Sequence, residues 1–367
     1  MKMLFCINSL EKGGAERVVC NLSNYLSTEY DISILTMINS NPQYPLNENI
    51  KLYHLDKKIK KFNKKSNTLS KLLKLILRKI NMRKMIKFIE PDIIISFLPE
   101  ISFLVLSSSR KNDKIIVSVR NDPKIEYSSK IYNFFMKKLY VRANGFVFQT
   151  IEAKEYFQGI IDCEVSIIPN PINPDFIELP YNGIRKKEIV SVGRLVPQKN
   201  FDLLIDGFFE LSDNYLKDYN LVIYGEGNLR EKLEKKIVKL GLENRVFLPG
   251  IVDNVKDKIY DSSLFVLTSL YEGMPNALME AMALGLPVLS SDCPCGGPRE
   301  LINNGVSGYL FENNNKKDLE DKIVTIISNV KLMKEISKNA NNICNTHDPK
   351  VLNKKWEDFI KLILEER

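Results

Sequence analysis

The sequence is poor in the residues that most often bind metal ions or form cross-links. Its 367 residues include only two histidines, His54 and His347, and six cysteines scattered along the chain. The closest cysteines, Cys293 and Cys295, are separated by one proline, and no pair of CxxC motifs exists. We therefore expect neither a structural zinc site nor a disulfide framework.

Long apolar runs are also missing. No segment approaches the roughly 18 consecutive apolar residues of a membrane-spanning helix, and the start, MKMLFCINSL, has too short an apolar run for a signal peptide. We expect a cytoplasmic protein that does not span a membrane. A chain of this length, with 44% apolar residues, favours two domains.

Acidic residues are absent from one segment. Residues 57–87 hold 13 Lys and Arg and no acid, whereas the whole chain has a net charge of +8, so the remainder carries −5. Such a local excess indicates one anionic contact rather than a protein that wraps nucleic acid. Within it, residues 69–89 predict a helix whose apolar and basic residues alternate. That helix fits an anionic membrane surface, and an ordinary solvated helix face fits it equally well.

Alternating strand and helix patterns predict an α/β fold with two doubly wound parallel sheets. The segment 169–174, Pro-Asn-Pro-Ile-Asn-Pro, interrupts the alternation and indicates a hinge. We predict a first domain over 1–170, a second over 171–349, and a last helix over 350–367. The predicted strands cover residues 2–8, 32–37, 50–55, 92–98, 114–119, 145–149, 164–168, 188–192, 221–224, 246–248, 264–268, 288–290 and 308–311. A single helix is predicted over 330–344.

The stretch 269–287 combines a buried helix with two acids. Its small apolar residues predict a helix that opens at Pro275 and closes at Gly285 in the left-handed conformation. Glu272 and Glu280 interrupt this apolar surface, and a buried carboxylate needs a partner. Hydroxyls of a bound polar ligand are one candidate. The positive end of the helix is an alternative partner for Glu280.

Glycine loops and cations are expected at the carboxyl ends of strands in the second domain, where a crevice between two doubly wound domains usually binds ligands. Arg194 and Lys199 follow one strand, and they suit a diphosphate, while acids suit ribose and sugar hydroxyls. The alternative, an exposed ion pair of Glu272 with either cation, explains the charges but not the glycines beside them. Those glycines are Gly225, Gly227 and Gly250.

A weaker glycine signal stands in the first domain. Gly13 and Gly14 lie between a strand and a helix, which is the arrangement that aims backbone N–H groups at a phosphate. The segment is neither a P-loop nor a dinucleotide fingerprint. On its own, this pattern favours a tight turn over a ligand site for both glycines.

In order along the chain, these segments resemble the retaining glycosyltransferases of family 4, of the bacterial surface-polysaccharide type, which have the GT-B fold of two Rossmann-like domains facing across a crevice. Glu272-x7-Glu280, preceded by Ser-Leu-Tyr and followed by Ala-Met-Ala-x-Gly-x-Pro-Val, is similar to the family's EX7E motif. The other matching segments are Gly13-Gly-Ala-Glu-Arg17, Ile168-Pro-Asn-Pro171, Val192-Gly-Arg-Leu-x3-Lys199, Gly225-x-Gly and Gly308-Tyr-Leu.

The resemblance implies a metal-independent enzyme without a cofactor. It would move a hexose or N-acetylhexosamine from a nucleotide-sugar, most commonly a UDP-sugar, to a lipid-linked or polysaccharide acceptor in surface glycan synthesis. Arg194, Lys199 and Glu272 would act on the reacting groups: the two cations hold the diphosphate, and the acid contacts the transferred sugar. The implied substrate-binding residues are Gly13, Gly14, Arg120, Asn121, Gly225, Gly227, Gly250, Gly273, Met274, Pro275, Asn276 and Glu280, the last on the ribose.

One departure from the family concerns the first-domain loop in which relatives often place a histidine near the donor sugar. Here that loop reads Val119-Arg-Asn-Asp122. We expect Arg120 or Asn121 to orient the sugar, with Asp122 as a candidate proton relay for the acceptor. The last helix, with Trp356, is expected to cross back to the first domain. A nucleotide-sugar epimerase of similar architecture and a non-catalytic sugar-nucleotide-binding partner remain alternatives.

Overall fold

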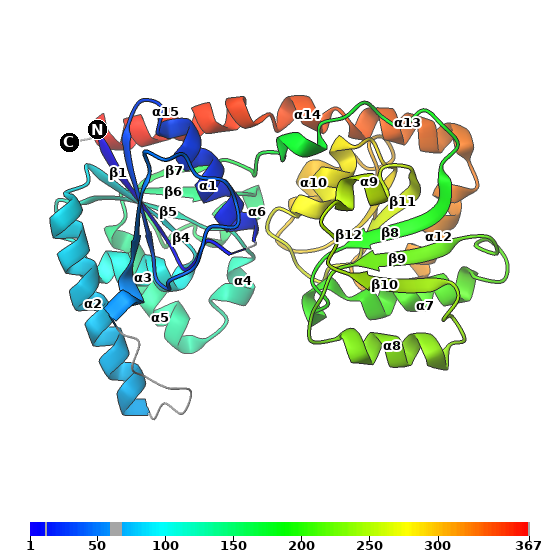
Figure 1. The fold of residues 1–367 in the computed structure, drawn as a ribbon, viewed down its shortest axis with the longest axis horizontal. Helices are drawn as coiled ribbons and strands as arrows, with labels where there is room; N and C mark the ends of the chain where they lie inside the picture. Colours follow the sequence, from blue (N-terminus) through cyan, green and yellow to red (C-terminus); the bar gives the residue numbers. More distant parts are fainter. Residues whose placement is uncertain (12, 59–67, 366–367) are drawn as a thin grey trace. The chain divides into compact units, whose positions relative to one another are not determined.

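The structure, a computed structural model, describes residues 1–11, 13–58 and 68–365, which form two units. The first unit takes Met1–Asn170 and the C-terminal segment from Lys350, and the second takes Pro171–Pro349. Each unit contains one parallel sheet with helices on its faces (Figure 1). Within the basic segment 57–87, residues 59–67 lie outside the described residues.

The sheet of the first unit has seven parallel strands in the order β3-β2-β1-β4-β5-β6-β7. Its centre is almost entirely apolar, which is typical of strands covered on both faces: Phe5 pairs with Ile34 on one side and Ile95 on the other. The strands are β1 Lys2–Ile7, β2 Asp31–Thr36, β3 Lys51–His54, β4 Ile93–Phe97, β5 Lys114–Ser118, β6 Gly145–Phe148 and β7 Glu164–Ile167. The α-helices of this unit are α1 Gly14–Leu26, α2 Thr68–Ile89, α3 Pro99–Ser108, α4 Pro123–Glu126, α5 Lys130–Leu139, α6 Ile151–Tyr156 and α15 Pro349–Glu365.

Helix α15, at the end of the chain, packs into the core of the first unit. Trp356 is only 1% exposed, and its ring stacks on Phe97 of β4 at 5.9 Å between centroids. The helix lies so close to β6 that a Cβ on Gly145 would stand 2.8 Å from the Cδ1 atom of Ile363. A larger residue at that point of the sheet would make Ile363 and Phe359 of α15 shift.

The sheet of the second unit has six parallel strands in the order β10-β9-β8-β11-β12-β13. Its strands are β8 Lys186–Val192, β9 Asn220–Tyr224, β10 Val246–Gly250, β11 Ser262–Leu267, β12 Val288–Asp292 and β13 Tyr309–Glu312. The α-helices are α7 Phe201–Leu211, α8 Arg230–Lys239, α9 Val255–Ile259, α10 Asn276–Ala283, α11 Gly297–Leu301, α12 Lys316–Ile327, α13 Val330–Ala340 and α14 Ile343–Thr346. The single helix predicted over 330–344 is therefore wrong, because the chain turns at Asn341 and Asn342 between α13 and α14.

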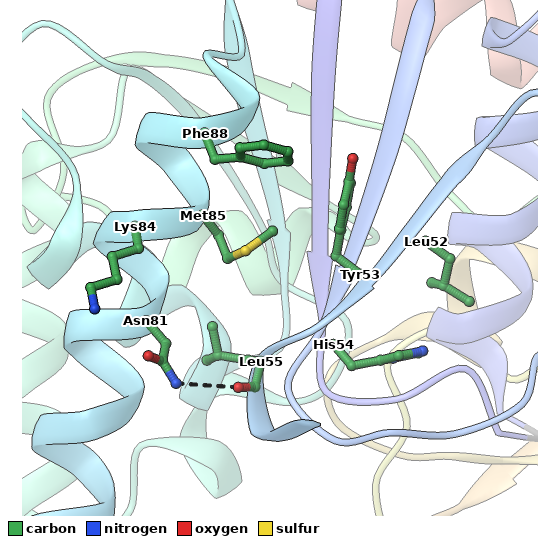
Figure 2. Close-up of a pocket in the computed structure, with 8 residues that line it drawn as sticks. All are labelled: Leu52, Tyr53, His54, Leu55, Asn81, Lys84, Met85 and Phe88. Atoms are coloured by element: carbon green, nitrogen blue, oxygen red, sulfur yellow. Dashed lines mark hydrogen bonds between the residues drawn. The ribbon is translucent and has the colours of Figure 1, made fainter. Parts of the chain in front are cut away.

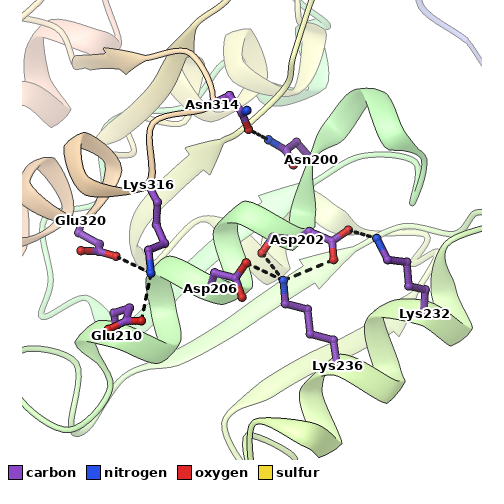
Figure 3. Close-up of polar contacts among 9 residues, drawn as sticks. All are labelled: Asn200, Asp202, Asp206, Glu210, Lys232, Lys236, Asn314, Lys316 and Glu320. Carbon is purple, nitrogen blue, oxygen red and sulfur yellow. Dashed lines mark hydrogen bonds and ion pairs between the residues drawn. The ribbon is translucent and has the colours of Figure 1, made fainter.

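Ion pairs attach α7 to the two helices beside it (Figure 3). Lys236 of α8 lies 2.7 Å from Asp206 and 3.4 Å from Asp202, while Lys316 of α12 lies 3.0 Å from Glu210. These contacts hold the helix that begins two residues after Lys199. They therefore fix the position of the loop that leads into α7.

Helix α2 does not bury the apolar residues of its N-terminal half. Large apolar side chains are exposed on it, namely Leu72, Leu73, Leu75, Ile76 and Ile80, whereas Met82, Ile86 and Ile89 are buried. The helix attaches to the preceding segment through Arg78, whose Nε donates to Asp56 Oδ1 at 3.0 Å. Within the described part of the chain, no helix is both long enough and apolar enough to cross a bilayer.

Candidate active site

The loops after β8 and β11 lie next to each other at the carboxyl end of the second sheet. The order of strands reverses between these two neighbours, which is where ligands bind in open α/β sheets. The backbone N–H of Leu270 donates to the carbonyl of Gln198 at 2.8 Å, and Gln198 Nε2 donates to the carbonyl of Tyr271 at 2.9 Å. These bonds join the cation-bearing loop to the acid-bearing one.

Glu272 is a buried carboxylate with two partners. Its side chain accepts from Lys199 Nζ at 2.5 Å and from Ser269 Oγ at 2.7 Å, and the residue is 7% exposed. Ser291 Oγ donates to the carbonyl of Ser269 at 2.6 Å and so supports it from β12. The sequence offered an exposed ion pair as the alternative to ligand binding; the pair with Lys199 is present, but it is buried.

Arg194 does not take part in that pair. It lies in the loop after β8, its side chain is exposed, and no acid of the described residues pairs with it. An exposed arginine on the same loop as Lys199 remains available to an anionic ligand. It is also the residue type that binds phosphates in a bidentate manner.

Helix α10 ends as the sequence predicted. Gly285 has φ +64°, its N–H donates to the carbonyl of Met282 at 2.9 Å, and the N–H of Leu286 donates to that of Ala281 at 3.0 Å. These two bonds form a Schellman motif. The apolar side chains of the helix are buried, and Glu280, in its second turn, is half-buried.

The loop from Gly273 to Asn276 is held tightly against the loop after β12. The N–H of Glu272 donates to the carbonyl of Pro294 at 2.6 Å, and the N–H of Cys295 returns a bond to the carbonyl of Glu272 at 2.8 Å. A Cβ on Gly297 would stand 1.8 Å from the carbonyl oxygen of Gly273. Since the side chain of Met274 packs in the core, this loop can offer a ligand mainly its backbone.

Packing and backbone conformation explain why glycine stands at positions 225, 227 and 250. Gly225 has φ +142°, and a Cβ there would stand 1.9 Å from the carbonyl oxygen of Gly193. A Cβ on Gly227 would stand 2.3 Å from that of Leu195, and Gly250 has φ +85°. The glycines therefore let the loop after β9 lie directly on the loop that carries Arg194, which positions the cation.

The predicted residues of the first unit do not form one polar cluster. Gly13 is the N-cap of α1 with an extended backbone (φ −172°), Gly14 is the first residue of that helix, and Asn121 is half-buried. Arg120 lies inside the unit, with its guanidinium over the rings of Phe97 at 5.0 Å and Trp356 at 5.4 Å.

Arg120 has fewer partners than a buried guanidinium usually finds. Its Nη1 donates to Asn170 Oδ1 at 3.1 Å, while Nε and Nη2 are buried without a partner. Burial lowers its pKa to about 9. The guanidinium is therefore buried between two rings with a single hydrogen-bond partner, and its contact with the donor sugar stays a prediction.

The side chain of Asp122 forms a hydrogen bond with the backbone two residues further on. Its carboxylate accepts from the N–H of Lys124 at 2.9 Å and caps α4, a short helix that the sequence did not predict. Burial raises the pKa of Asp122. Burial, together with the charges of Glu100 and Asp122, raises the pKa of Glu126 to about 8.

Sequence reasoning missed the residues that support Glu272. Ser269 belongs to the quoted motif, but only the structure shows that its hydroxyl donates to the carboxylate of Glu272. The sequence signal that could have predicted this bond is a hydroxyl residue three positions before a buried acid. Cys293 also lies near this acid: burial first, and then the charge of Glu272, raises the pKa of its thiol to about 12. Among the described residues, no three His, Cys, Asp or Glu side chains gather as a metal site.

A separate cavity of about 370 Å³ lies in the first unit, between the edge strand β3 and helix α2 (Figure 2). Its wall is mostly apolar, and the rings of Tyr53 and Phe88 meet edge to face at 6.2 Å. Asn81 Nδ2 donates to the carbonyl of Leu55 at 3.4 Å across its floor. None of the residues predicted to bind substrate lines it.

The second unit thus has a buried Lys–Glu pair, an arginine that no described acid pairs with, and glycine-packed loops at the switch point of a parallel sheet. Residues 12–176 match the profile described as Glycosyltransferase Family 4, and residues 182–343 match Glycosyl transferases group 1. The chain belongs to glycosyltransferase family 4 and has the GT-B fold.

Relatives of known sequence agree with this assignment. The chain is 33% identical over 271 residues to a glycosyltransferase of Methanocaldococcus jannaschii, covering 67% of this chain and 66% of that one. It is 26% identical over 368 residues to the Campylobacter jejuni alpha-1,4-N-acetyl-D-galactosaminyltransferase that acts on GalNAc-alpha-(1->4)-GalNAc-alpha-(1->3)-diNAcBac-PP-undecaprenol, covering 100% and 99%.

Among solved structures, Staphylococcus aureus TarM in complex with Fondaparinux, alpha-GlcNAc-glycerol and UDP superposes with a TM-score of 0.78. The identity is 18% and the coverage is 100% of both chains. At this identity the similarity establishes the fold alone. It confirms the predicted pair of doubly wound domains.

Proposed function

We propose that this glycosyltransferase is a retaining, metal-independent enzyme that moves a hexose or N-acetylhexosamine from a UDP-sugar to a lipid-linked or polysaccharide acceptor at the cytoplasmic face of the membrane. The observation that carries the donor part is the group of Arg194, Lys199 and Glu272 on two joined loops. Two cations and one carboxylate on a fixed backbone match the two ends of a nucleotide-diphosphate sugar.

The roles within this site follow from charge and burial. Arg194 is exposed and unpaired by any described acid, so it would meet the donor diphosphate first. Lys199 would share its charge between Glu272 and the diphosphate. The carboxylate would then accept hydrogen bonds from hydroxyls of the transferred sugar, while Glu280 on α10 would accept them from the ribose.

The reaction replaces one bond at the anomeric carbon by another. The bond to the diphosphate oxygen breaks, the acceptor hydroxyl oxygen bonds to the same carbon on the same face, and the hydroxyl proton leaves with the departing diphosphate. Negative charge grows on the leaving group, and Arg194 and Lys199 would offset it. Removal of one such preorganised donor typically costs about 10²–10³ in kcat.

The donor base and the acceptor class are suggested by the relatives. TarM was solved with UDP, and the Campylobacter relative acts on a diphospho-undecaprenol-linked glycan. We therefore propose a UDP-sugar as donor and a polyprenyl-diphosphate-linked glycan or a surface polysaccharide as acceptor. In this reading the first unit is the acceptor side, and the second unit, from Pro171 to Pro349, holds the donor.

Peripheral contact with an anionic membrane would bring the enzyme to such an acceptor. Helix α2 exposes five large apolar side chains between residues 72 and 80 and has no acid between residues 68 and 89. Exposed apolar side chains on a helix that carries basic residues and no acids are typical of helices that lie in the membrane interface. We propose this contact for the described part of the basic segment.

The donor site is tested by Arg194→Ala and Glu280→Gln. Each variant should lose most of the sugar transfer while remaining folded by circular dichroism. A thermal-shift screen against UDP-, GDP- and ADP-sugars should give the largest stabilisation with a UDP-sugar. Full activity in either variant would contradict the assigned site.

Product analysis separates the alternatives. A transferase consumes the donor only when the acceptor is present, and nuclear magnetic resonance should show the donor's anomeric configuration in the product. Conversion of the donor alone would indicate an epimerase. Calorimetric binding of the donor without turnover on any acceptor would indicate a non-catalytic partner.

The membrane contact is tested by replacing cations of α2 other than the two that pair with Asp56. Lys74 and Arg78 both pair with Asp56, so their replacement would also disturb the fold. Arg83, Lys84 and Lys87 are exposed. Their joint replacement by Gln should weaken binding to anionic vesicles at low salt, at about 1 kcal/mol for each charge. Unchanged binding would refute the contact.

A further inference from the structure

Helix α5 of the first unit turns an apolar stripe away from the core. Ile131, Phe134 and Phe135 are 66%, 59% and 43% exposed, and they stand at spacings of three and four residues, on one face of the helix. A helix on the surface of a globular unit normally buries such a stripe and exposes its polar face. In α5 the arrangement is reversed over these positions.

The attachment of α5 shows that this exposure is built into the fold. The opposite face of the helix packs on α3 and on the aromatic core: Met136 is buried, and the ring of Tyr132 meets that of Phe103 at 5.6 Å. Tyr132 Oη also donates to Glu100 Oε1 at 3.1 Å. Phe135, the least exposed residue of the stripe, also reaches the ring of Phe103 at 6.3 Å. The helix therefore has a fixed orientation, and Ile131 and Phe134 lie on its free face.

Helix α5 carries basic residues beside the stripe. Between residues 124 and 142, the exposed side chains are apolar, basic or serine, and none of them is acidic. Of the exposed basic residues, Lys124 lies 3.5 Å from Glu152 and Arg142 donates to the carbonyl of Ser109 at 3.2 Å. The remaining ones, Lys130, Lys137 and Lys138, belong to α5, and the ammonium of Lys138 lies 5.7 Å from the ring centre of Phe134. Aromatic and aliphatic side chains beside cations match the interface of an anionic bilayer, where chains meet the acyl region and cations meet phosphates.

The neighbouring helix supports the same partner. Helices α2 and α5 both pack against α3, and both expose apolar and basic side chains, with no acid in the described residues of either. We propose that the surface formed by Ile131, Phe134, Phe135 and the cations of α5 is a second bilayer contact, which inserts its aromatic side chains among anionic lipids. It extends the membrane contact proposed for α2, but it does not depend on sugar transfer.

A matched control exists on the second unit. Phe209 on α7 has an exposed fraction of 40%, similar to the 43% of Phe135. Helix α7, however, carries the acids Asp206 and Glu210, which pair with lysines of α8 and α12 (Figure 3). An anionic bilayer would not favour that face. Phe209→Ser therefore removes a similar apolar side chain without touching the proposed contact.

The test uses the full chain and vesicles of phosphatidylglycerol mixed with phosphatidylcholine, sedimented without donor or acceptor. Phe134→Ser with Phe135→Ser should weaken binding about tenfold or more, since each side chain loses its burial in lipid. Replacing Lys130, Lys137 and Lys138 by Gln should weaken it by about fivefold for each charge. Phe209→Ser should bind as the parent chain does.

A fluorescence measurement keeps the proposal falsifiable if the serine variant folds poorly. Phe134→Trp places a reporter on the stripe, and the native Trp356 is buried and gives a constant background. The emission of the new side chain should shift to the blue with anionic vesicles and be quenched by brominated lipid.

Absence of both changes would overturn the proposal. So would unaltered vesicle binding of a folded serine variant. Loss of self-association in that variant, with vesicle binding unchanged, would assign the stripe to a second copy of the chain instead.

Discussion

Substitutions in the buried pair of Lys199 and Glu272 should separate its effect on stability from its effect on UDP binding. Lys199→Met leaves the Glu272 carboxylate, 7% exposed, with only the hydroxyl of Ser269. Breaking a buried pair by removing one partner costs about 3–5 kcal/mol. For a unit of this size, each kcal/mol lowers Tm by about 2–4 °C, so the lower figure of ~3 kcal/mol predicts a fall of about 6–12 °C.

Glu272→Gln should behave differently. The amide has the same shape, its oxygen can still accept from Ser269, and Lys199, at 14% side-chain exposure, can turn to water. The expected cost is about 1 kcal/mol. The double variant, which contains no buried charge without a partner, should be more stable than Lys199→Met alone, so the two effects are not additive.

UDP binding completes the prediction. Glu272→Gln frees the ammonium of Lys199, so calorimetry should show UDP affinity kept or improved, while sugar transfer falls. Lys199→Met should lose about 10- to 100-fold in UDP affinity, which corresponds to the ~1.5–3 kcal/mol of a hydrogen bond to a charged group. Equal loss of UDP binding in both variants would refute the reasoning, because the acid would then act only by positioning the lysine.

Three further substitutions, at Gly225, Arg120 and Glu126, should change stability in ways that unfolding experiments can measure. Gly225→Ala should destabilise by more than about 3 kcal/mol in urea unfolding, because its Cβ would stand 1.9 Å from the carbonyl oxygen of Gly193 at φ +142°; a wild-type midpoint would contradict the packing. Arg120→Met should change the free energy of unfolding, followed by Trp356 fluorescence, by no more than about 1 kcal/mol, because the lost cation–π contacts are offset by removing two buried nitrogens without a partner; a loss above about 3 kcal/mol would show a net structural role. Glu126 is protonated in the folded state at neutral pH because its pKa is about 8 against an ordinary 4.5. Between these two pKa values the folded state holds a proton that the unfolded state has lost. The free energy of unfolding therefore falls as pH rises from about 4.5 to 8, by ~5 kcal/mol at most. Glu126→Gln should remove this slope in urea titrations at pH 5 and pH 8, and an unchanged slope would contradict the shift.

Much of the fold was predictable because local and long-range signals agree. Central strands such as β1, Lys2–Ile7, are continuous apolar runs, and the Gly285 stop of α10 follows from backbone sterics alone. The break between α13 and α14 was not predictable, because Asn341 is set by tertiary contacts: its Nδ2 donates to the carbonyl of Glu178 at 2.9 Å, 163 residues away.

The candidate site was predictable in its residue types and less so in its arrangement. The spacing of Glu272 and Glu280 marked the two acids, but no spacing could decide whether Arg194 or Lys199 would pair with Glu272. That choice depends on backbone bonds between two loops far apart in sequence. In the same way, the interior position of Arg120 depends on Trp356 of α15, which is more than 200 residues further along the chain.

The position of α15 has a consequence for the order in which the protein can form. The second unit, Pro171–Pro349, is an insertion within the first, because residues 1–170 meet their last helix only after it. During synthesis, the sheet that carries Phe97 and Gly145 must wait, with part of its apolar face uncovered, until Trp356 and Ile363 arrive. The inserted unit has its own core and can fold during that interval. The first half of the chain is therefore the part that most needs protection from aggregation while it is being made.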